Sequence, residues 1–246
     1  MMLNSKICDK PSLECDEKQC YDVGLLDEIY VGRGAMKLKS FLDGQNFEIS
    51  GKDALDIGSS TGGFMQILLQ NGANSVVGVD VGSDQLAAKL RSDTRVKVYE
   101  NTNIREFVAT AGFELITCDV AFISVIEILD AICKNAKSGA LIIVLFKPQF
   151  EVGRGRLARG GVVRDPEMHV ETVLAVAARA HELGAGVDAV EASPLPGPAG
   201  NVEYFVNLRA GCGGAPTDLV GEALLAETRR AVAEGPAGCS TERRQP

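Results

Sequence analysis

The sequence predicts an α/β protein built on a mostly parallel, doubly wound sheet, and three observations lead to this fold class. Short apolar runs alternate with amphipathic segments between residues 54 and 208. The first of these runs leads directly into a glycine-rich turn and then a helix-like segment. Asp165 and Pro166 form a helix-start pair, with Asp as the cap and Pro at the first helical position. Strands that alternate with helices form sheets covered by helices on both faces.

The expected elements follow from these patterns in chain order. Strands are expected at 54–57, 75–79, 95–99, 115–118, 140–146, 187–191 and 204–208. Helices are expected at 35–42, 63–69, 85–91, 104–109, 122–136 and 166–183, with a further helix-like stretch at about 218–233. The only two histidines, His169 and His181, fall in the 166–183 pattern and are expected on the surface of that helix.

Composition and charge exclude several classes of protein. The chain has 246 residues, of which 46% are hydrophobic and 24% charged, so it is neither disordered nor a membrane bundle. Its most apolar run has six residues (141–146), whereas a spanning helix needs about 20. No signal peptide is recognisable in the first 30 residues, so a cytoplasmic protein is expected. The net charge of −8 argues against nonspecific coating of nucleic acid, but it allows a local basic site.

The chain divides into three regions. Residues 1–29 carry three basic and seven acidic residues and read as an acidic, cysteine-containing extension. Residues 30–210 hold the alternating pattern and form the predicted domain, and 211–246 read as a tail with one helix followed by disorder. The seven cysteines fit reduced thiols better than a disulfide framework. Cys8, Cys15 and Cys20 could hold zinc, but they form no CxxC pair and have no nearby histidine, so no metal site is predicted.

The glycine-rich turn at 56–64 (D-I-G-S-S-T-G-G-F) is the strongest local signal for a ligand. It follows the first strand at the sheet edge where open α/β sheets bind ligands. The next strand ends in Asp80, whose carboxylate can accept both hydroxyls of a nucleoside ribose. The dinucleotide fingerprint GxGxxG is absent, and Asp56 would repel a pyrophosphate but suits an ammonium group, as in S-adenosylmethionine. The alternative is a tight strand-to-helix turn that binds nothing.

The same turn also matches a nucleophile elbow. Residues 58–62 read G-S-S-T-G and fit the GxSxG pattern of hydrolases. That mechanism needs a downstream acid and then a histidine, usually on a loop, whereas both histidines fall within a helical pattern. A serine hydrolase is therefore disfavoured.

Charged side chains that could act on a substrate occur in unusual settings. Arg33 and Lys37 lie at a glycine-flanked helix start, where cations are disfavoured. Asp119 ends the fourth strand, and capping of the next helix is its alternative role. Lys147 emerges from the most apolar strand, and its desolvation favours a neutral amine that could act as a base. Glu203 begins the last strand, after a Pro- and Gly-rich loop.

A basic loop follows Lys147. It has no Asp or Glu from 152 to 164, and its arginines are Arg154, Arg156, Arg159 and Arg164. A flexible basic loop beside an active site suits a substrate with a phosphate backbone, and an ordinary surface loop is the alternative.

At these clusters the sequence resembles the FtsJ-like RNA 2′-O-methyltransferases, and specifically their hemolysin-A branch, which modifies ribosomal RNA. The resemblance spans about residues 30–209. Its motifs are Y-V-G-R-G-A-M-K-L (30–38), L-D-I-G-S-S-T-G-G-F (55–64), V-G-V-D-V-G (77–82), N-T-N-I-R (101–105), D-V-A-F-I-S (119–124), K-P-Q-F-E-V-G (147–153), G-G-V-V-R-D-P (160–166) and G-P-A-G-N-V-E-Y (197–204).

This resemblance implies a Rossmann-like methyltransferase fold, S-adenosyl-L-methionine as cofactor, and transfer to a ribose 2′-hydroxyl of rRNA, most often of cytidine. It implies a catalytic tetrad of Lys37, Asp119, Lys147 and Glu203. For the cofactor it implies that the methionine end is held by Gly58, Ser59, Thr61 and Gly62, the ribose by Asp80, and the adenine region by Asn103 and Ile104. Asp119 would lie near the sulfonium, and Arg33 and the basic loop would contact RNA.

Members of this branch usually begin with a small basic S4-type RNA-binding domain of about 60 residues, whereas only 29 residues, seven of them acidic and three basic, precede Tyr30 here. The expected partners are rRNA or ribosomal subunits, with no membrane and no stable protein partner. Two alternatives stay open. One is a hemolysin-like membrane-active protein, and the other is a cofactor-binding, RNA-associated protein without catalysis.

Overall fold

One seven-stranded sheet organises the protein in the computed structural model, which describes residues 2–3, 6–7, 23–24, 30–157 and 160–235. The strand order is β6-β5-β4-β7-β8-β10-β9. The first five strands in this order run parallel, and β10 is antiparallel to both β8 and β9. The strands are β4 (Asp53–Ile57), β5 (Ser75–Val79), β6 (Val96–Tyr99), β7 (Phe113–Cys118), β8 (Ala136–Phe146), β9 (Gly186–Ala192) and β10 (Tyr204–Arg209). The predicted doubly wound α/β fold is confirmed.

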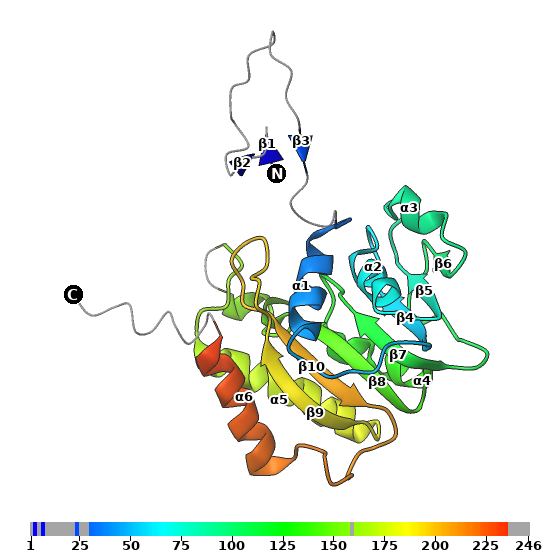
Figure 1. The fold of residues 1–246 in the computed structure, drawn as a ribbon. Helices are drawn as coiled ribbons and strands as arrows, with labels where there is room; N and C mark the ends of the chain where they lie inside the picture. Colours follow the sequence, from blue (N-terminus) through cyan, green and yellow to red (C-terminus); the bar gives the residue numbers. More distant parts are fainter. Residues whose placement is uncertain (1, 4–5, 8–22, 25–29, 158–159, 236–246) are drawn as a thin grey trace.

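Helices cover both faces of this sheet (Figure 1). The helices are α1 (Arg33–Leu42), α2 (Gly63–Gln70), α3 (Ala88–Arg91), α4 (Leu129–Lys134), α5 (Pro166–Glu182) and α6 (Gly221–Glu234). Side chains of α1, α2 and α3 share one buried core with one face of the sheet, and those of α4, α5 and α6 share a second core with the other face. Short 3₁₀ turns follow β7 and β8: η1 (Val125–Glu127), η2 (Pro148–Phe150) and η3 (Arg154–Arg156).

Both ends of the chain contain secondary structure outside the predicted domain of residues 30–210. Near the N-terminus, β1 (Met2–Leu3), β2 (Lys6–Ile7) and β3 (Val23–Gly24) form a small antiparallel sheet. The cysteines weighed as a zinc site, Cys8, Cys15 and Cys20, lie outside the described residues. At the other end, α6 forms close to the expected position and buries Leu224, Ala231 and Val232 in the core with α5. Residues after 210 therefore contribute to the core of the domain.

Local chemistry accounts for the start of α5. The Asp165 carboxylate accepts a hydrogen bond of 3.0 Å from the backbone N–H of Glu167, and Pro166 occupies the first turn. The predicted helix-start pair is confirmed. His169, however, is 1% exposed, so its expected place on the helix surface is wrong. Its ring Nδ1 lies 3.1 Å from the Tyr204 hydroxyl and its Nε2 lies 3.1 Å from the Val163 carbonyl oxygen, which compensates for burial of the ring.

The helix expected at 104–109 does not form, because one distant side chain takes over the backbone groups of that segment. The Asn135 amide nitrogen donates to the Phe107 carbonyl oxygen, and the Asn135 carbonyl oxygen accepts from the backbone N–H of Ala109. These groups would otherwise bond within a helix. The segment runs through turns instead.

The helix expected at 122–136 is also replaced, here by η1 followed by α4. Phe122 has a φ of +65°, which is incompatible with a right-handed helix. The Ser124 side chain then accepts from the backbone N–H of Ile126 and caps η1. Strand β8 begins at Ala136, four residues before the expected start at residue 140.

Aromatic packing fixes α1 on the face of the sheet at β10, the strand between β8 and β9. The rings of Phe41 in α1 and Phe205 in β10 stack with centroids 4.1 Å apart and an interplanar angle of 14°. Phe205 is fully buried, and its neighbours along the chain include Glu203, which contacts α1 directly. This packing fixes the position of α1 along β10.

Replacing Phe205 with alanine should therefore lower the free energy of unfolding by about 3–5 kcal/mol, because the surrounding core cannot collapse fully into the space left by the ring. Chemical denaturation followed by circular dichroism measures the change. The control is Val108→Ala at a side chain that is 78% exposed, for which about 0.5 kcal/mol or less is expected. Equal losses for the two variants would contradict the packing described for Phe205.

Candidate active site

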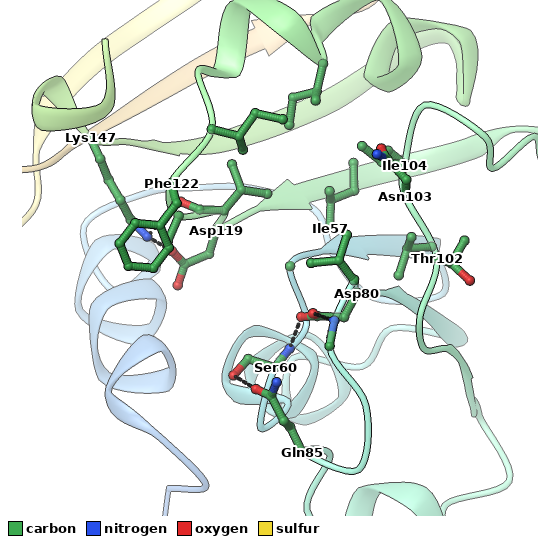
Figure 2. Close-up of a pocket in the computed structure, with 18 residues that line it drawn as sticks. Ile57, Ser60, Asp80, Gln85, Thr102, Asn103, Ile104, Asp119, Phe122 and Lys147 are labelled. Carbon is green, nitrogen blue, oxygen red and sulfur yellow. Dashed lines mark hydrogen bonds and ion pairs between the residues drawn. The ribbon is translucent and has the colours of Figure 1, made fainter. Parts of the chain in front are cut away.

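Two connected cavities lie at the carboxyl ends of β4, β5 and β7. The larger has a volume of about 690 Å³ and extends from Lys147 and Asp119 to Asn103 and Ile104. The smaller has a volume of about 180 Å³ and lies between the start of α1 and the turn that precedes α2. Gly58, Ser60 and Asp119 line both cavities. Figure 2 shows the larger one, with Asp119 and Lys147 at one end and Asn103 and Ile104 at the other.

Two positions of the glycine turn leave no room for a side chain. Gly58 has a φ of +78°, and a Cβ atom there would lie 2.5 Å from the Asp119 carbonyl oxygen. Gly62 has a φ of +91°, and a Cβ atom there would collide with Leu90. Ser59 and Thr61 line the smaller cavity, whereas Gly62 lines neither. Gly62 is thus placed by its packing against Leu90, beside the cavities.

The Asp80 carboxylate binds backbone N–H groups of the glycine turn and of its own loop. Its Oδ2 accepts a hydrogen bond of 2.7 Å from the backbone N–H of Ser60, and its Oδ1 accepts one of 2.7 Å from that of Gly82. Each carboxylate oxygen can accept more than one hydrogen bond, so both remain available to a pair of hydroxyls. Ser60, with a φ of +45°, also places its hydroxyl 3.0 Å from the Gln85 amide oxygen (Figure 2).

The larger cavity is mainly apolar. Ile57, Val79 and Ile128 line it, and Ile104, which is 6% exposed, lies at the end farthest from Lys147. Asn103 adds a polar side chain at the same end (Figure 2). A flat heteroaromatic ring with polar edges fits such a slot, because apolar walls contact its faces while polar groups fix its orientation.

The smaller cavity contains buried polar atoms that lack partners. Asp56 is 1% exposed, and its Oδ1 accepts a hydrogen bond of 2.8 Å from the Thr117 hydroxyl. Its Oδ2 has no partner, and neither has the buried Ser59 hydroxyl. Burial is the main cause that raises the pKa of Asp56, to about 7, and the negative charges of Asp119 and Asp80 add to it. A buried carboxylate with a free oxygen is a site for a cationic group.

Lys147 and Asp119 form an ion pair at the junction of the cavities. The Nζ atom lies 2.5 Å from the Asp119 Oδ1 and donates a hydrogen bond of 2.9 Å to the Val120 carbonyl oxygen. Both side chains are largely buried, with 13% and 22% exposed. The sequence predicted desolvation of Lys147 but not its pairing with Asp119.

A second lysine–carboxylate pair joins α1 to the residue before β10. Lys37 Nζ lies 2.6 Å from Glu203 Oε2, and the two side chains are 7% and 2% exposed. The Glu203 carboxyl is itself enclosed, because a Cβ atom on Gly197 would lie 2.5 Å from its Oε1. The cation near the start of α1 is thus explained by a buried partner that is distant in the sequence. The four residues of the expected tetrad form two ion pairs.

The predicted RNA-binding arginines have different surroundings. Arg33 is exposed at the rim of the smaller cavity and donates to the Pro196 carbonyl oxygen at 3.1 Å. Arg156 forms a two-pronged pair with Glu171 of α5, with N···O distances of 2.8 and 2.6 Å. Arg164 is exposed. Arg154 lies in η3, and Arg159 lies outside the described residues.

Sequence reasoning missed Phe122. Its side chain is 92% exposed although it lines the larger cavity, beside Asp119 and Lys147 (Figure 2). Its backbone adopts the left-handed region, which is uncommon for a bulky residue and clusters at functional sites. The only sequence signal was an aromatic residue three positions after Asp119. The helical pattern that begins at Phe122 concealed it.

The serine-nucleophile alternative is contradicted by the surroundings of Ser60. Its hydroxyl contacts Gln85, and both histidines of the chain lie on α5. His169 contacts Tyr204 and Val163, and His181 lies 2.8 Å from the Asp218 carboxylate. No histidine is therefore placed to activate Ser60.

Known proteins are similar to this chain in sequence and in fold. The FtsJ-like methyltransferase family matches residues 30–210. The 16S/23S rRNA (cytidine-2′-O)-methyltransferase TlyA of Mycobacterium tuberculosis is 46% identical over 213 residues, which are 85% of this chain and 78% of that protein. The 23S rRNA (cytidine-2′-O)-methyltransferase TlyA of Campylobacter jejuni is 46% identical over 182 residues, covering 74% of this chain and 71% of the relative.

A solved structure agrees with these matches. A protein from Lactococcus lactis that carries the name hemolysin superposes with a TM-score of 0.74 at 40% identity, covering 82% of this chain and 97% of the other. The sheet order, the glycine turn and the two ion pairs thus occur within an established fold, the Rossmann-like fold of methyltransferases. The chain belongs to the FtsJ-like methyltransferase family.

Proposed function

We propose that this chain is an S-adenosylmethionine-dependent 2′-O-methyltransferase of rRNA, acting on the ribose of cytidine. The observation that carries the proposal is the buried Lys147–Asp119 contact in the wall of the larger cavity, with a second buried lysine–carboxylate pair, Lys37–Glu203, between α1 and the residue before β10. Two relatives that are 46% identical bear the name of this activity. The substrate is rRNA, free or within a ribosomal subunit, and the enzyme acts in the cytoplasm.

The residues present suit S-adenosylmethionine. Asp56 would hold the ammonium group, and Ser59 with Thr61 would hold the rest of the methionine end, because all three line the smaller cavity and Asp56 and Ser59 have unpartnered oxygen atoms there. Asp80 would accept the ribose hydroxyls, and the slot beside Asn103 and Ile104 would take the adenine. When bound, this cofactor supplies an electrophilic methyl group on a sulfonium.

The two lysines would then act on the acceptor. A 2′-hydroxyl is a weak nucleophile, and its proton must leave as attack proceeds. Lys147 Nζ, in its neutral form, would receive that proton, with Asp119 orienting the amine. Lys37 and Glu203 would orient the hydroxyl from the α1 side. Such positioning supplies much of the acceleration in a displacement of this kind.

Phe122 would contact the acceptor nucleotide outside the cavity. An exposed aromatic ring at the mouth of a site that modifies RNA can stack on a base that has left its helix. Exposed Arg164 would contact the phosphate backbone. Dependence on a 2′-hydroxyl selects RNA over DNA.

Replacing Lys147 with methionine should lower methyl transfer at least about 100-fold, because the proton acceptor is lost while the apolar stem is kept. Transfer of tritiated methyl groups to isolated 30S and 50S subunits, followed by mapping of the modified ribose, measures the activity. Lys134→Met, at a side chain that is 68% exposed, is the matched control.

Two outcomes would contradict this assignment. One is transfer at the wild-type rate by Lys147→Met. The other is leakage of phospholipid vesicles by a wild-type protein that transfers no methyl group, which would favour the membrane-active alternative. Among the residues that the structure describes, no helix is long and apolar enough to cross a bilayer.

Cofactor affinity should fall as the pH is lowered from 8 to 6. The pKa of Asp56 is raised to about 7, so the carboxyl is mostly neutral at pH 6 and must release its proton to hold an ammonium group. The expected loss is about tenfold, with uptake of a proton by the buffer at the lower pH. Calorimetric titration in two buffers of different ionisation enthalpy measures both quantities.

Asp56→Asn is the control for this linkage. It should bind the cofactor weakly at both pH values and release no proton. The same raised pKa makes the folded protein bind more protons than the unfolded chain between about pH 4 and pH 7, so Asp56 lowers the free energy of unfolding as the pH rises through that window. A wild-type affinity that is equal at pH 6 and pH 8 would refute the role given to Asp56.

A further inference from the structure

The loop of residues 119–125, which follows β7 and forms one wall of the larger cavity, is held at both of its ends by a single other segment. At its start, Lys147 contacts the Asp119 carboxylate and the Val120 carbonyl oxygen. At its end, Glu151 accepts a hydrogen bond of 2.5 Å from the Ser124 hydroxyl through Oε2. Its Oε1 accepts a second one, of 2.8 Å, from the Val125 backbone N–H.

Phe122 lies between these two attachments and has an unfavourable conformation. Its φ of +65° is costly for a residue with a bulky side chain, and its ring is 92% exposed. The ring contacts Phe150, with centroids 5.3 Å apart and an interplanar angle of 51°. Because a free loop would relax to a cheaper backbone conformation and cover its apolar ring, the surroundings must hold Phe122 in place.

Glu151 has no direct access to the reacting groups. It lines neither cavity, and it is half-buried behind η2. Burial raises the pKa of its carboxyl, while the two donated hydrogen bonds work in the opposite direction. Burying this carboxyl costs desolvation, and its two hydrogen bonds both go to the loop of residues 119–125. Its contacts therefore act on the conformation of that loop.

We propose that Glu151 is a positioning residue that holds Phe122 in its exposed conformation at the cavity mouth and thereby sets the affinity for the acceptor nucleotide. This inference rests on the proposed function, because it assigns Phe122 to the RNA. The competing explanation is that Glu151 only stabilises η1, without influence on substrate binding. The two explanations differ in which kinetic constant changes and in whether the Phe122 ring is released.

The first experiment needs no methyl transfer. The chain contains no tryptophan, so Phe122→Trp introduces a single fluorophore at the position of interest. In that background Glu151→Leu should lower the fluorescence anisotropy of Trp, because the loop loses its attachment at Ser124 and Val125. Glu127→Gln, an exposed glutamate of η1, is the matched control and should leave the anisotropy unchanged. Unchanged anisotropy in Glu151→Leu would overturn the proposal.

The second experiment separates binding from chemistry in the chain that keeps Phe122. Glu151→Leu should raise KM for the RNA about tenfold and change kcat less than about threefold, while the dissociation constant for S-adenosylmethionine stays the same. Glu151→Gln should restore KM to within about threefold of wild type, because the amide can accept from the Val125 N–H and donate to the Ser124 hydroxyl. A loss of melting temperature without any change in KM would leave only the stabilising role and refute the proposal.

Ser124→Ala provides a variant that risks the fold less. It removes the Ser124–Glu151 hydrogen bond and the cap on the Ile126 N–H but keeps the Val125–Glu151 bond, so it should raise KM by a smaller factor than Glu151→Leu. The double variant Ser124→Ala, Glu151→Leu should raise KM for the RNA no more than Glu151→Leu does alone, because both changes break the same Ser124–Glu151 contact. If the increase in KM of the double variant equals the product of the two single-variant increases, the two residues do not act through a shared contact. If the wild-type chain transfers no methyl group to rRNA, the proposed function fails, and the anisotropy measurement alone decides whether Glu151 holds Phe122.

Discussion

The buried ion pair between Lys37 and Glu203 is the contact on which the geometry of the site depends most. It joins two residues 166 positions apart, with an N···O distance of 2.6 Å and almost no exposure to water. A buried charge without its partner is strongly destabilising, so α1 and the approach to β10 are forced into one relative position. The stack of Phe41 on Phe205 acts on the same two elements. The start of α1 is thereby held against the turn before α2.

Negative charge is concentrated at this edge, and each carboxylate there is compensated differently. Parallel strands β4, β5 and β7 bring Asp56, Asp80 and Asp119 to one side of the sheet. Asp119 has Lys147, and Asp80 has two backbone N–H groups. Asp56 accepts from one side-chain hydroxyl, and burial together with the neighbouring negative charges raises its pKa to about 7. Such an edge favours a ligand that carries positive charge, as a sulfonium with an ammonium group does.

Much of the fold and of the site was predictable, and the failures have specific causes. Every expected strand forms, because apolar runs in a parallel sheet are local and strong signals. The helix expected at 104–109 fails because Asn135, far along the chain, binds its backbone groups. His169 is buried rather than exposed because Tyr204 and Val163 provide partners for its ring. In each case a contact distant in the sequence overrides a local pattern.

The sequence alone determined where the strands of the sheet form and the glycine turn with Asp56 and Asp80. It determined them because strand and helix periodicity, and the conformations open to glycine, act over a few residues. Only the tertiary structure decided how the tetrad pairs, that Gly62 packs against Leu90 instead of lining a cavity, and that Phe122 projects at the mouth. These features depend on which side chains meet across elements, and that is fixed by packing and by partners for buried charge.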